Sequence, residues 1–128
     1  MITSIHTMIY SDDPAATRAF LRDVLRWPYV AEEFDAEWLI FRCGPSEMGV
    51  HPTYSIWEGK EYSHPRHHTI SLMCDDLEAT MEELAARGAQ FTSPVQEQVY
   101  GRNVMLAVPG ADDIQLYQPS HLLAYKLP

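Results

Sequence analysis

Two stretches of the chain share the same order of apolar and polar positions. Each begins with residues that alternate between two faces, as in a β-strand, continues with a pair of aspartates, and ends with apolar residues at helical spacing. An internal repeat of this kind indicates a duplicated structural unit. The chain is therefore predicted to contain two copies of a strand, a cap and a helix. Five residues of the first copy recur 63 positions later: Asp12, Asp13, Ala16, Thr17 and Leu21 match Asp75, Asp76, Ala79, Thr80 and Leu84.

The first copy predicts one helix and four strands. Residues 2–11 alternate between apolar and polar side chains, which predicts a strand. Asp12 and Asp13 stand between this strand and the helix, so we interpret them as helix caps and not as a pair of catalytic carboxylates. The helix is predicted over residues 14–26, because a proline follows closely. Three short strands are predicted after it, at residues 29–34, 37–43 and 47–53.

The second copy repeats this order after a predicted linker. Residues 54–66 contain glycine, proline and charged residues without a sustained period, which predicts irregular structure. A strand at residues 68–74 leads into a helix that ends at Gly88, a residue suited to a helix C-terminus. Strands are then predicted at residues 90–99, 103–108 and 113–118. The resulting division is one domain over residues 1–128, with modules at about 1–55 and 67–119, a linker at about 56–66 and a tail at 120–128.

Composition and charge narrow the possible partners. The chain has 128 residues, of which 46% are hydrophobic, which is typical of one globular domain. Its formal net charge of −9 argues against nucleic-acid binding, and no apolar run approaches the roughly 20 residues that span a membrane. Cys43 and Cys74 are too few for a disulfide framework, and the first residues lack a signal-peptide pattern, so a cytoplasmic location is expected. A small molecule is the expected partner.

Several motifs together resemble one known superfamily. They are the HTM and HTI triplets at residues 6–8 and 68–70, the aspartate pairs with the following alanine and threonine, the YGR triplet at 100–102, and the closing IQLYQP at 114–119. The chain thereby resembles the vicinal oxygen chelate superfamily, which includes glyoxalase I, bleomycin and fosfomycin resistance proteins and extradiol dioxygenases. The resemblance implies an α+β fold in which two βαβββ modules form a curved, half-open mixed sheet, a cup with the helices outside. It also implies a homodimer, whose cups are completed within one chain or across two chains.

The same resemblance implies four metal-ligand positions inside the cup. In this chain those positions carry His6, His51, Thr69 and Gln115. Glyoxalase-type members have carboxylates at the places of His51 and Gln115, and a neutral amide cannot act as the base of their reaction. His68 would join the set if a bulge turned its side chain inward. Imidazole ligands suit Zn, Ni, Co or Fe, so the expected ion, if one binds, is one of these.

Other side chains are predicted to contact a substrate or ligand in the cup. Aromatic residues are candidates because they offer flat apolar surfaces, although aromatic residues occur as often in a core. Arg102 would meet an anionic group, although an exposed arginine at a strand end is common. The complete predicted set is Met8, Tyr10, Trp38, Thr69, Ser71, Met73, Tyr100 and Arg102.

Two functions remain open from the sequence. One is a metal-dependent lyase or dioxygenase, in which the ion acts as a Lewis acid on a small molecule with two neighbouring oxygens. The other is a metal-free binding protein like the bleomycin resistance proteins, which holds an apolar or cationic small molecule. The two histidines at matched positions favour the first function. The absent carboxylates favour the second.

Overall fold

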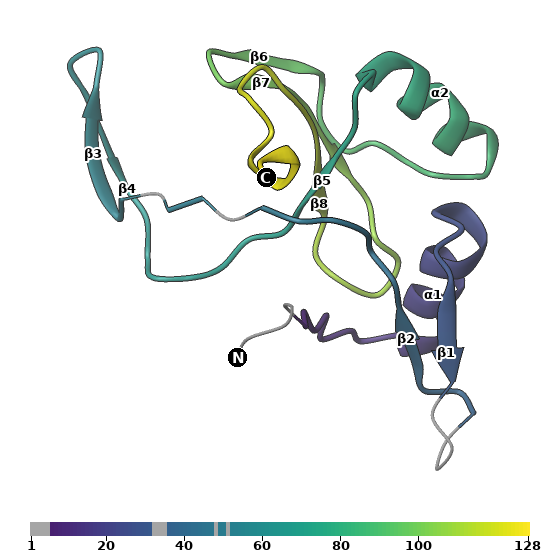
Figure 1. The fold of residues 1–128 in the computed structure, drawn as a ribbon. Helices are drawn as coiled ribbons and strands as arrows, with labels where there is room; N and C mark the ends of the chain where they lie inside the picture. The colour runs from purple at the N-terminus through teal and green to yellow at the C-terminus, as the bar shows by residue number, and fades with distance from the viewer. Residues whose placement is uncertain (1–5, 32–35, 48, 51) are drawn as a thin grey trace.

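A computed structural model of the chain describes residues 6–31, 36–47, 49–50 and 52–128, and Figure 1 shows its fold. The chain is α+β, as predicted. The helices α1 and α2 lie on one side of a four-stranded sheet, and the C-terminal turn η2 lies on the other side (Figure 1). In chain order the elements are α1 (Pro14–Ala19), η1 (Phe20–Val24), β1 (Tyr29–Ala31), β2 (Leu39–Phe41), β3 (Tyr54–Trp57), β4 (Lys60–Ser63), β5 (Ser71–Met73), α2 (Leu77–Ala86), β6 (Gln96–Gln98), β7 (Gly101–Leu106), β8 (Ile114–Pro119) and η2 (Ala124–Lys126).

The second aspartate of each pair caps the helix that follows it. The carboxylate of Asp13 accepts a hydrogen bond from the Ala16 backbone N–H at 3.1 Å. Its counterpart Asp76 accepts one from the Ala79 backbone N–H at 2.9 Å. Such caps satisfy N–H groups that have no partner inside the helix. The predicted role as a cap is confirmed for Asp13 and Asp76, and the repeat in the sequence is a repeat in structure at these helix starts.

The second module has the predicted βαβββ order. Its strands form a mixed sheet in the order β5-β8-β7-β6, in which β5 and β8 are parallel and the other neighbours are antiparallel. The helix α2 lies between β5 and β6 in the chain. Parallel strands need a long crossover connection, and α2 is part of the connection between the parallel strands β5 and β8. Strands β5 and β6 are shorter than predicted, whereas β7 begins two residues earlier and β8 one residue later than predicted. Residue 91 forms only an isolated bridge to β7.

The core lies between this sheet and the two helices. Strand alternation places one set of side chains from β7 and β8 toward the helices. Val104 and Leu106 are completely buried there, together with Leu77 at the start of α2. Leu21 and Leu84, which are related by the sequence repeat, are both buried in the same core. The two copies of the repeat therefore contribute to one shared core.

The first module differs from the prediction. Residues 6–11 and the described residues of 47–53 are not in a strand, so the predicted strands are wrong at these positions, and residues 1–5, 48 and 51 lie outside the described part of the chain. Strands β1 and β2 pair with each other in a separate two-stranded sheet. A strand exists only where a neighbour satisfies its backbone hydrogen bonds, and a local apolar pattern does not supply that neighbour.

A hairpin occupies part of the segment that was predicted to be an irregular linker. Strands β3 and β4 pair in an antiparallel register around the two-residue turn Glu58-Gly59. Both turn residues have positive φ, at 50° and 76°, which suits the twist of a tight hairpin. The hairpin projects away from the four-stranded sheet (Figure 1). Within the part of the chain that the structure describes, no helix is long and apolar enough to cross a membrane.

Candidate functional site

The candidate site is the surface of the four-stranded sheet that points away from α1 and α2. Strand alternation and the register of the paired strands define which side chains share this surface, because directly paired residues point to the same face. We call it the open face. Its members include four carboxamides and no charged side chain from β5, β6, β7 or β8: Ser71, Met73, Gln96, Gln98, Asn103, Met105, Gln115 and Tyr117.

Ser71 and Gln115 form one polar pair on the open face. They are direct partners in the parallel pairing of β5 with β8. The Ser71 hydroxyl donates a hydrogen bond to the Gln115 side-chain carbonyl at 3.0 Å. The amide oxygen that the metal hypothesis requires as a ligand is therefore already an acceptor within the protein.

Asn103 and Tyr117 form the centre of the open face. They are direct partners in the antiparallel pairing of β7 with β8. Asn103 is only 3% exposed, and its side-chain Nδ2 has no hydrogen-bond partner. Tyr117 donates its hydroxyl proton to the backbone carbonyl of Tyr100 at 2.8 Å. Burial raises the pKa of the Tyr117 hydroxyl, so this residue stays neutral at physiological pH.

The C-terminal tail approaches the open face. The ring of His121 lies 6.1 Å from the Tyr117 ring, and the Ser120 backbone N–H donates to the Tyr100 carbonyl at 2.9 Å. Glu47 also contacts the tail, because its carboxylate accepts a hydrogen bond from the backbone N–H of Ala124 at 2.8 Å. The same carboxylate lies 3.4 Å from Nε2 of His121. The turn η2 therefore sits over the side of the sheet that the helices leave uncovered (Figure 1).

The predicted metal ligands do not converge in the described part of the chain. His6 is exposed, and its Nε2 lies 3.3 Å from the sulfur of Met8. His68 is exposed in the segment before β5, and Gln115 is bonded to a serine as described above. His51 lies outside the described residues. Among the described residues, no three His, Cys, Asp or Glu side chains form a group that could hold a metal ion.

The predicted substrate-binding residues fall into two groups. Ser71 and Met73 belong to the open face, and the Tyr100 ring lies beside it, 5.9 Å from the ring of Tyr117. The remaining residues, apart from Arg102, are exposed on segments outside the four-stranded sheet: Met8, Tyr10, Trp38 and Thr69.

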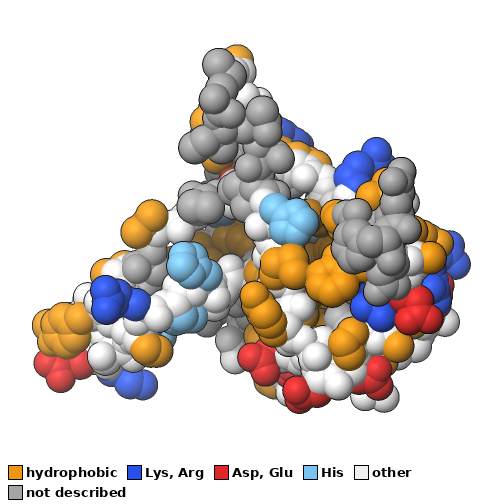
Figure 2. Space-filling model, turned by 90° about the horizontal axis from the view of Figure 1, so that it is seen from below, with side chains coloured by type: hydrophobic (Ala, Val, Ile, Leu, Met, Phe, Trp, Pro, Cys, Tyr) orange, Lys and Arg blue, Asp and Glu red, His pale blue; other side chains and the backbone are white. Residues whose placement is uncertain are grey.

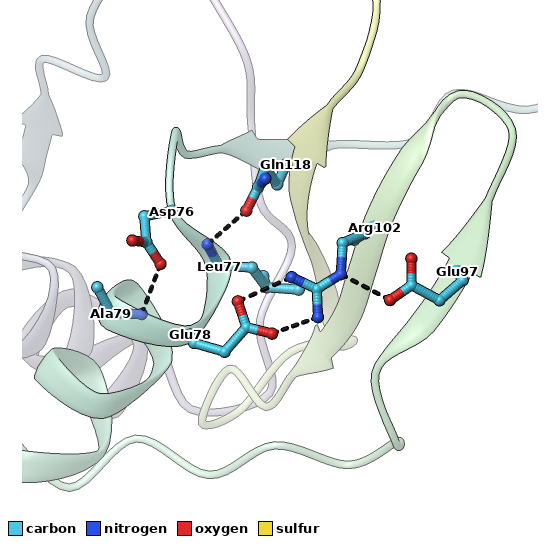
Figure 3. Close-up of polar contacts among 7 residues, drawn as sticks. All are labelled: Asp76, Leu77, Glu78, Ala79, Glu97, Arg102 and Gln118. Carbon is cyan, nitrogen blue, oxygen red and sulfur yellow. Dashed lines mark hydrogen bonds and ion pairs between the residues drawn. The ribbon is translucent and has the colours of Figure 1, made fainter.

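Arg102 lies on the opposite, helix-facing side of the sheet (Figure 3). Its guanidinium donates to Glu97 at 2.8 Å and makes two hydrogen bonds to the carboxylate of Glu78 at the start of α2. These bonds lower the pKa of the Glu78 carboxyl. Gln118 adds a further link from the sheet to the helix, because its side-chain carbonyl accepts from the Leu77 backbone N–H at 2.7 Å. Arg102 thus ties β6 and β7 to α2.

Two shallow hollows also lie on the helix-facing side. One of about 210 Å³ is lined by Phe20 and the residues that follow α2. The other, of about 240 Å³, is lined by residues of α2, β5 and the segment after η1, including Cys74, whose thiol pKa is raised by burial. Neither hollow is lined by Asn103, Gln115 or Tyr117. Met73 is the one residue of the open face that lines either of these two hollows.

The residues of this region that were not predicted as site residues include Glu47, Asn103, Tyr117 and His121. Two of them could have been found from the sequence. Tyr117 follows Gln115 by two positions, so it shares the same face of one strand. Asn103 precedes Val104 and Leu106, whose alternating apolar side chains mark the core side of the strand, so Asn103 points to the opposite face. The approach of Glu47 to His121 joins segments far apart in the sequence, and no local pattern indicates it.

Comparisons with known proteins agree with this architecture. The family model described as "Glyoxalase/Bleomycin resistance protein/Dioxygenase superfamily" matches residues 3–116. No curated protein sequence matches the chain. Among solved structures, a lactoylglutathione lyase from Agrobacterium tumefaciens is similar with a TM-score of 0.60 at 15% identity, over 91% of this chain and 92% of that one.

Two further solved structures have a similar fold. A member of the glyoxalase/bleomycin resistance protein/dioxygenase superfamily from Sphaerobacter thermophilus has a TM-score of 0.53 at 20% identity, over 91% of this chain and 98% of that one. The antibiotic binding protein TnmS3 from a Streptomyces species has a TM-score of 0.52 at 20% identity, over 94% of this chain and 99% of that one. At these identities the similarity concerns the fold.

Proposed function

Because the chain belongs to the glyoxalase/bleomycin resistance protein/dioxygenase superfamily, we propose that it binds a neutral small organic molecule on the open face without a metal ion. The observation that carries this proposal is the chemistry of that face. Carboxamide and hydroxyl side chains line it, and the Nδ2 of the buried Asn103 lacks a partner. The strands of this face offer hydrogen bonds and apolar contact, but no base and no carboxylate ligand. The Glu47 carboxylate and the His121 ring beside the face lie 3.4 Å from each other, and Glu47 also accepts a hydrogen bond from the Ala124 backbone N–H.

The relatives support both a binding function and a catalytic one. One solved neighbour is an antibiotic binding protein, and another is a lactoylglutathione lyase. A fold shared by binders and enzymes does not select between them, so the choice depends on the side chains. The superfamily includes many metal-dependent enzymes, and a metal would supply a Lewis acid for a substrate with neighbouring oxygens. That role requires protein ligands that converge on one ion.

The described residues do not fit a resident divalent ion. His6 and His68 are exposed, and the carbonyl oxygen of Gln115 accepts a hydrogen bond from Ser71. Catalytic Zn or Fe sites usually combine three protein ligands, often including a carboxylate, around an open position. The described part of the chain provides no such group. We therefore derive no reaction step through a metal, and we retain Zn, Ni, Co or Fe binding through His6 and His51 as the alternative that the following experiment tests.

The first test compares metals with a neutral aromatic ketone. Protein treated with a chelator is expected to keep its melting temperature when Zn, Ni, Co or Fe(II) is added, and to bind 9-fluorenone equally well with and without EDTA. A specific ion at 100 times its dissociation constant would stabilise the fold by about 2.7 kcal/mol, which is a shift of several degrees. Differential scanning fluorimetry and a fluorescence titration provide the two measurements.

The matched control is the double variant His6→Ala/His51→Ala. A metal-dependent shift that disappears in this variant would contradict the proposal and favour the metal-dependent enzyme. A shift that persists in the variant would indicate ion binding elsewhere on the surface, and binding of fluorenone in EDTA would still support the proposed function.

We also propose that the working form is a homodimer. The accessible surface of the chain is 10024 Å², whereas a compact monomer of 14.6 kDa exposes about 6,900 Å². The difference is large enough for an obligate dimer interface, which buries roughly 2,000–5,000 Å² in total. Many large apolar side chains are exposed, and Figure 2 shows hydrophobic side chains exposed over one face.

The β3–β4 hairpin is the part of the surface that we expect to contact the second copy. Ile56 and Trp57 are 61% and 58% exposed, and a hairpin that stands alone is only marginally stable in water. Light scattering after size-exclusion chromatography is expected to give twice 14.6 kDa for the wild type and a shift toward the monomer for Ile56→Ser/Trp57→Ser. Val50→Ser is the control, because Val50 is 97% exposed outside the hairpin. A monomeric wild type would refute the dimer.

The proposed location is the cytoplasm. Both cysteines are free thiols in the structure, and Cys43 is exposed, which suits a reducing compartment.

A further inference from the structure

We infer that the Asn103 side chain is the group that recognises the ligand, by donating a hydrogen bond to a carbonyl oxygen of a neutral, planar molecule. This inference rests on the proposed function of the open face. It adds a recognition residue and a chemical class of ligand to that proposal.

The position of Asn103 suits a fixed donor. It lies on β7, which pairs with β6 on one side and β8 on the other, so the backbone of Asn103 is held from both sides. On the open face its direct neighbours across the strands are Gln96 and Tyr117. A side chain on a doubly paired strand keeps its direction better than one on a loop, and recognition of a ligand requires that precision.

The stability cost of the unpartnered Asn103 donor favours a role in ligand recognition over a structural role. A buried donor without a partner destabilises a fold, whereas an apolar residue of the same shape at that position would be neutral or favourable. Asn103 is 3% exposed and nevertheless leaves its Nδ2 without a partner, although three other carboxamides share the same face. If only the stability of the fold mattered, an apolar residue such as leucine would be favoured at this position. A donor that is kept free at a cost to the fold is expected where a ligand supplies the acceptor.

The neighbours of Asn103 define the ligand class. Tyr117 is the direct strand partner of Asn103 on β8, and the rings of Tyr100 and His121 lie 5.9 Å and 6.1 Å from the Tyr117 ring, so three aromatic rings lie close together on this part of the open face. Such rings favour a planar partner. The hydroxyl of Tyr117 already donates to the Tyr100 carbonyl, which leaves the Asn103 amide as the free donor of the pair. Because the strands of the open face add no charge, a neutral carbonyl oxygen is the acceptor that fits.

The test uses two planar tricyclic molecules that differ in one carbonyl oxygen, 9-fluorenone and fluorene. Wild-type protein is expected to bind fluorenone about tenfold more tightly than fluorene, the size of effect that one hydrogen bond to a buried donor produces. Asn103→Leu is expected to lose this preference and to keep its affinity for fluorene. Gln90→Leu, which removes an exposed carboxamide outside the open face, is expected to keep the tenfold preference.

The possible binding results distinguish a failure of the role of Asn103 from a failure of the binding function. Equal affinity for the two molecules in the wild type, or a preference that survives in Asn103→Leu, overturns the role of Asn103 and leaves the binding function standing. Failure of both molecules to bind overturns the binding function and the inference together. The wild-type comparison needs no variant, so it holds even if a substitution impairs folding. A melting temperature of Asn103→Leu equal to or above the wild-type value is expected, because the substitution removes an unsatisfied polar group.

Discussion

Replacing Leu106 by alanine is expected to lower the free energy of unfolding by about 2–5 kcal/mol. Leu106 is completely buried on β7 and belongs to the core between the four-stranded sheet and the helices. The substitution removes apolar contacts and leaves a cavity that the paired strands on both sides cannot close. Urea unfolding followed by circular dichroism measures the change, which should appear as a lower midpoint with an unchanged slope.

Leu122→Ala is the matched control for this experiment. It makes the same chemical change at a residue that is 93% exposed in the tail, so its effect is expected to stay within about 0.5 kcal/mol. An equal loss in both variants would show that the core is not where the structure places it. A loss at Leu122 alone would mean that the tail is buried in solution, for example against a second copy.

Replacing Gly101 by alanine is expected to cost roughly 2–4 kcal/mol of stability. Gly101 has a φ of +146°, a conformation that residues with a Cβ rarely adopt. An added Cβ would lie 2.3 Å from the backbone oxygen of Gln118 and 2.9 Å from Cα of Pro119. These are backbone atoms of the paired strand β8, so the contact cannot be relieved by a rotamer change. Thermal unfolding measures the loss.

The same substitution is also expected to weaken fluorenone binding. The added Cβ would lie 2.8 Å from Cε2 of the Tyr117 ring, which forms part of the open face. Gly49→Ala is the control, because no atom lies within 4 Å of the Cβ position there. If Gly101→Ala matched the control in stability, the close packing of β7 on β8 at this position would be refuted.

The two faces of the four-stranded sheet make different kinds of contact. On the helix side, Arg102 and Gln118 fasten the start of α2 to β7 and β8, in the contacts that Figure 3 shows. On the open face, the side chains that alternate with them, Asn103 and Tyr117, are directed away from the core. Neighbouring residues of β7 and β8 therefore point to opposite faces, one toward a structural contact with α2 and the next toward the candidate binding site. Exchanging their directions would require a shift of the pairing register of the whole strand.

The sequence determined the parts of this structure that depend on neighbours along the chain. The aspartates at residues 13 and 76 cap their helices because a cap needs only the backbone three residues further on. The inward direction of Leu116 and the outward direction of Gln115 follow from the period of a strand. The repeat and the closing motif were enough to place the chain in its superfamily, which the family match over residues 3–116 confirms.

Only the tertiary structure decided which distant groups meet. The strand predicted at residues 2–11 has no strand conformation at residues 6–11, since a local pattern cannot provide the neighbour that a ladder requires. The unpartnered amide of Asn103 and the approach of Glu47 to the tail depend on which segments come together across the fold. An alternating pattern in the sequence predicts to which face of a strand each side chain points. Which groups the side chain contacts there depends on how the whole chain packs.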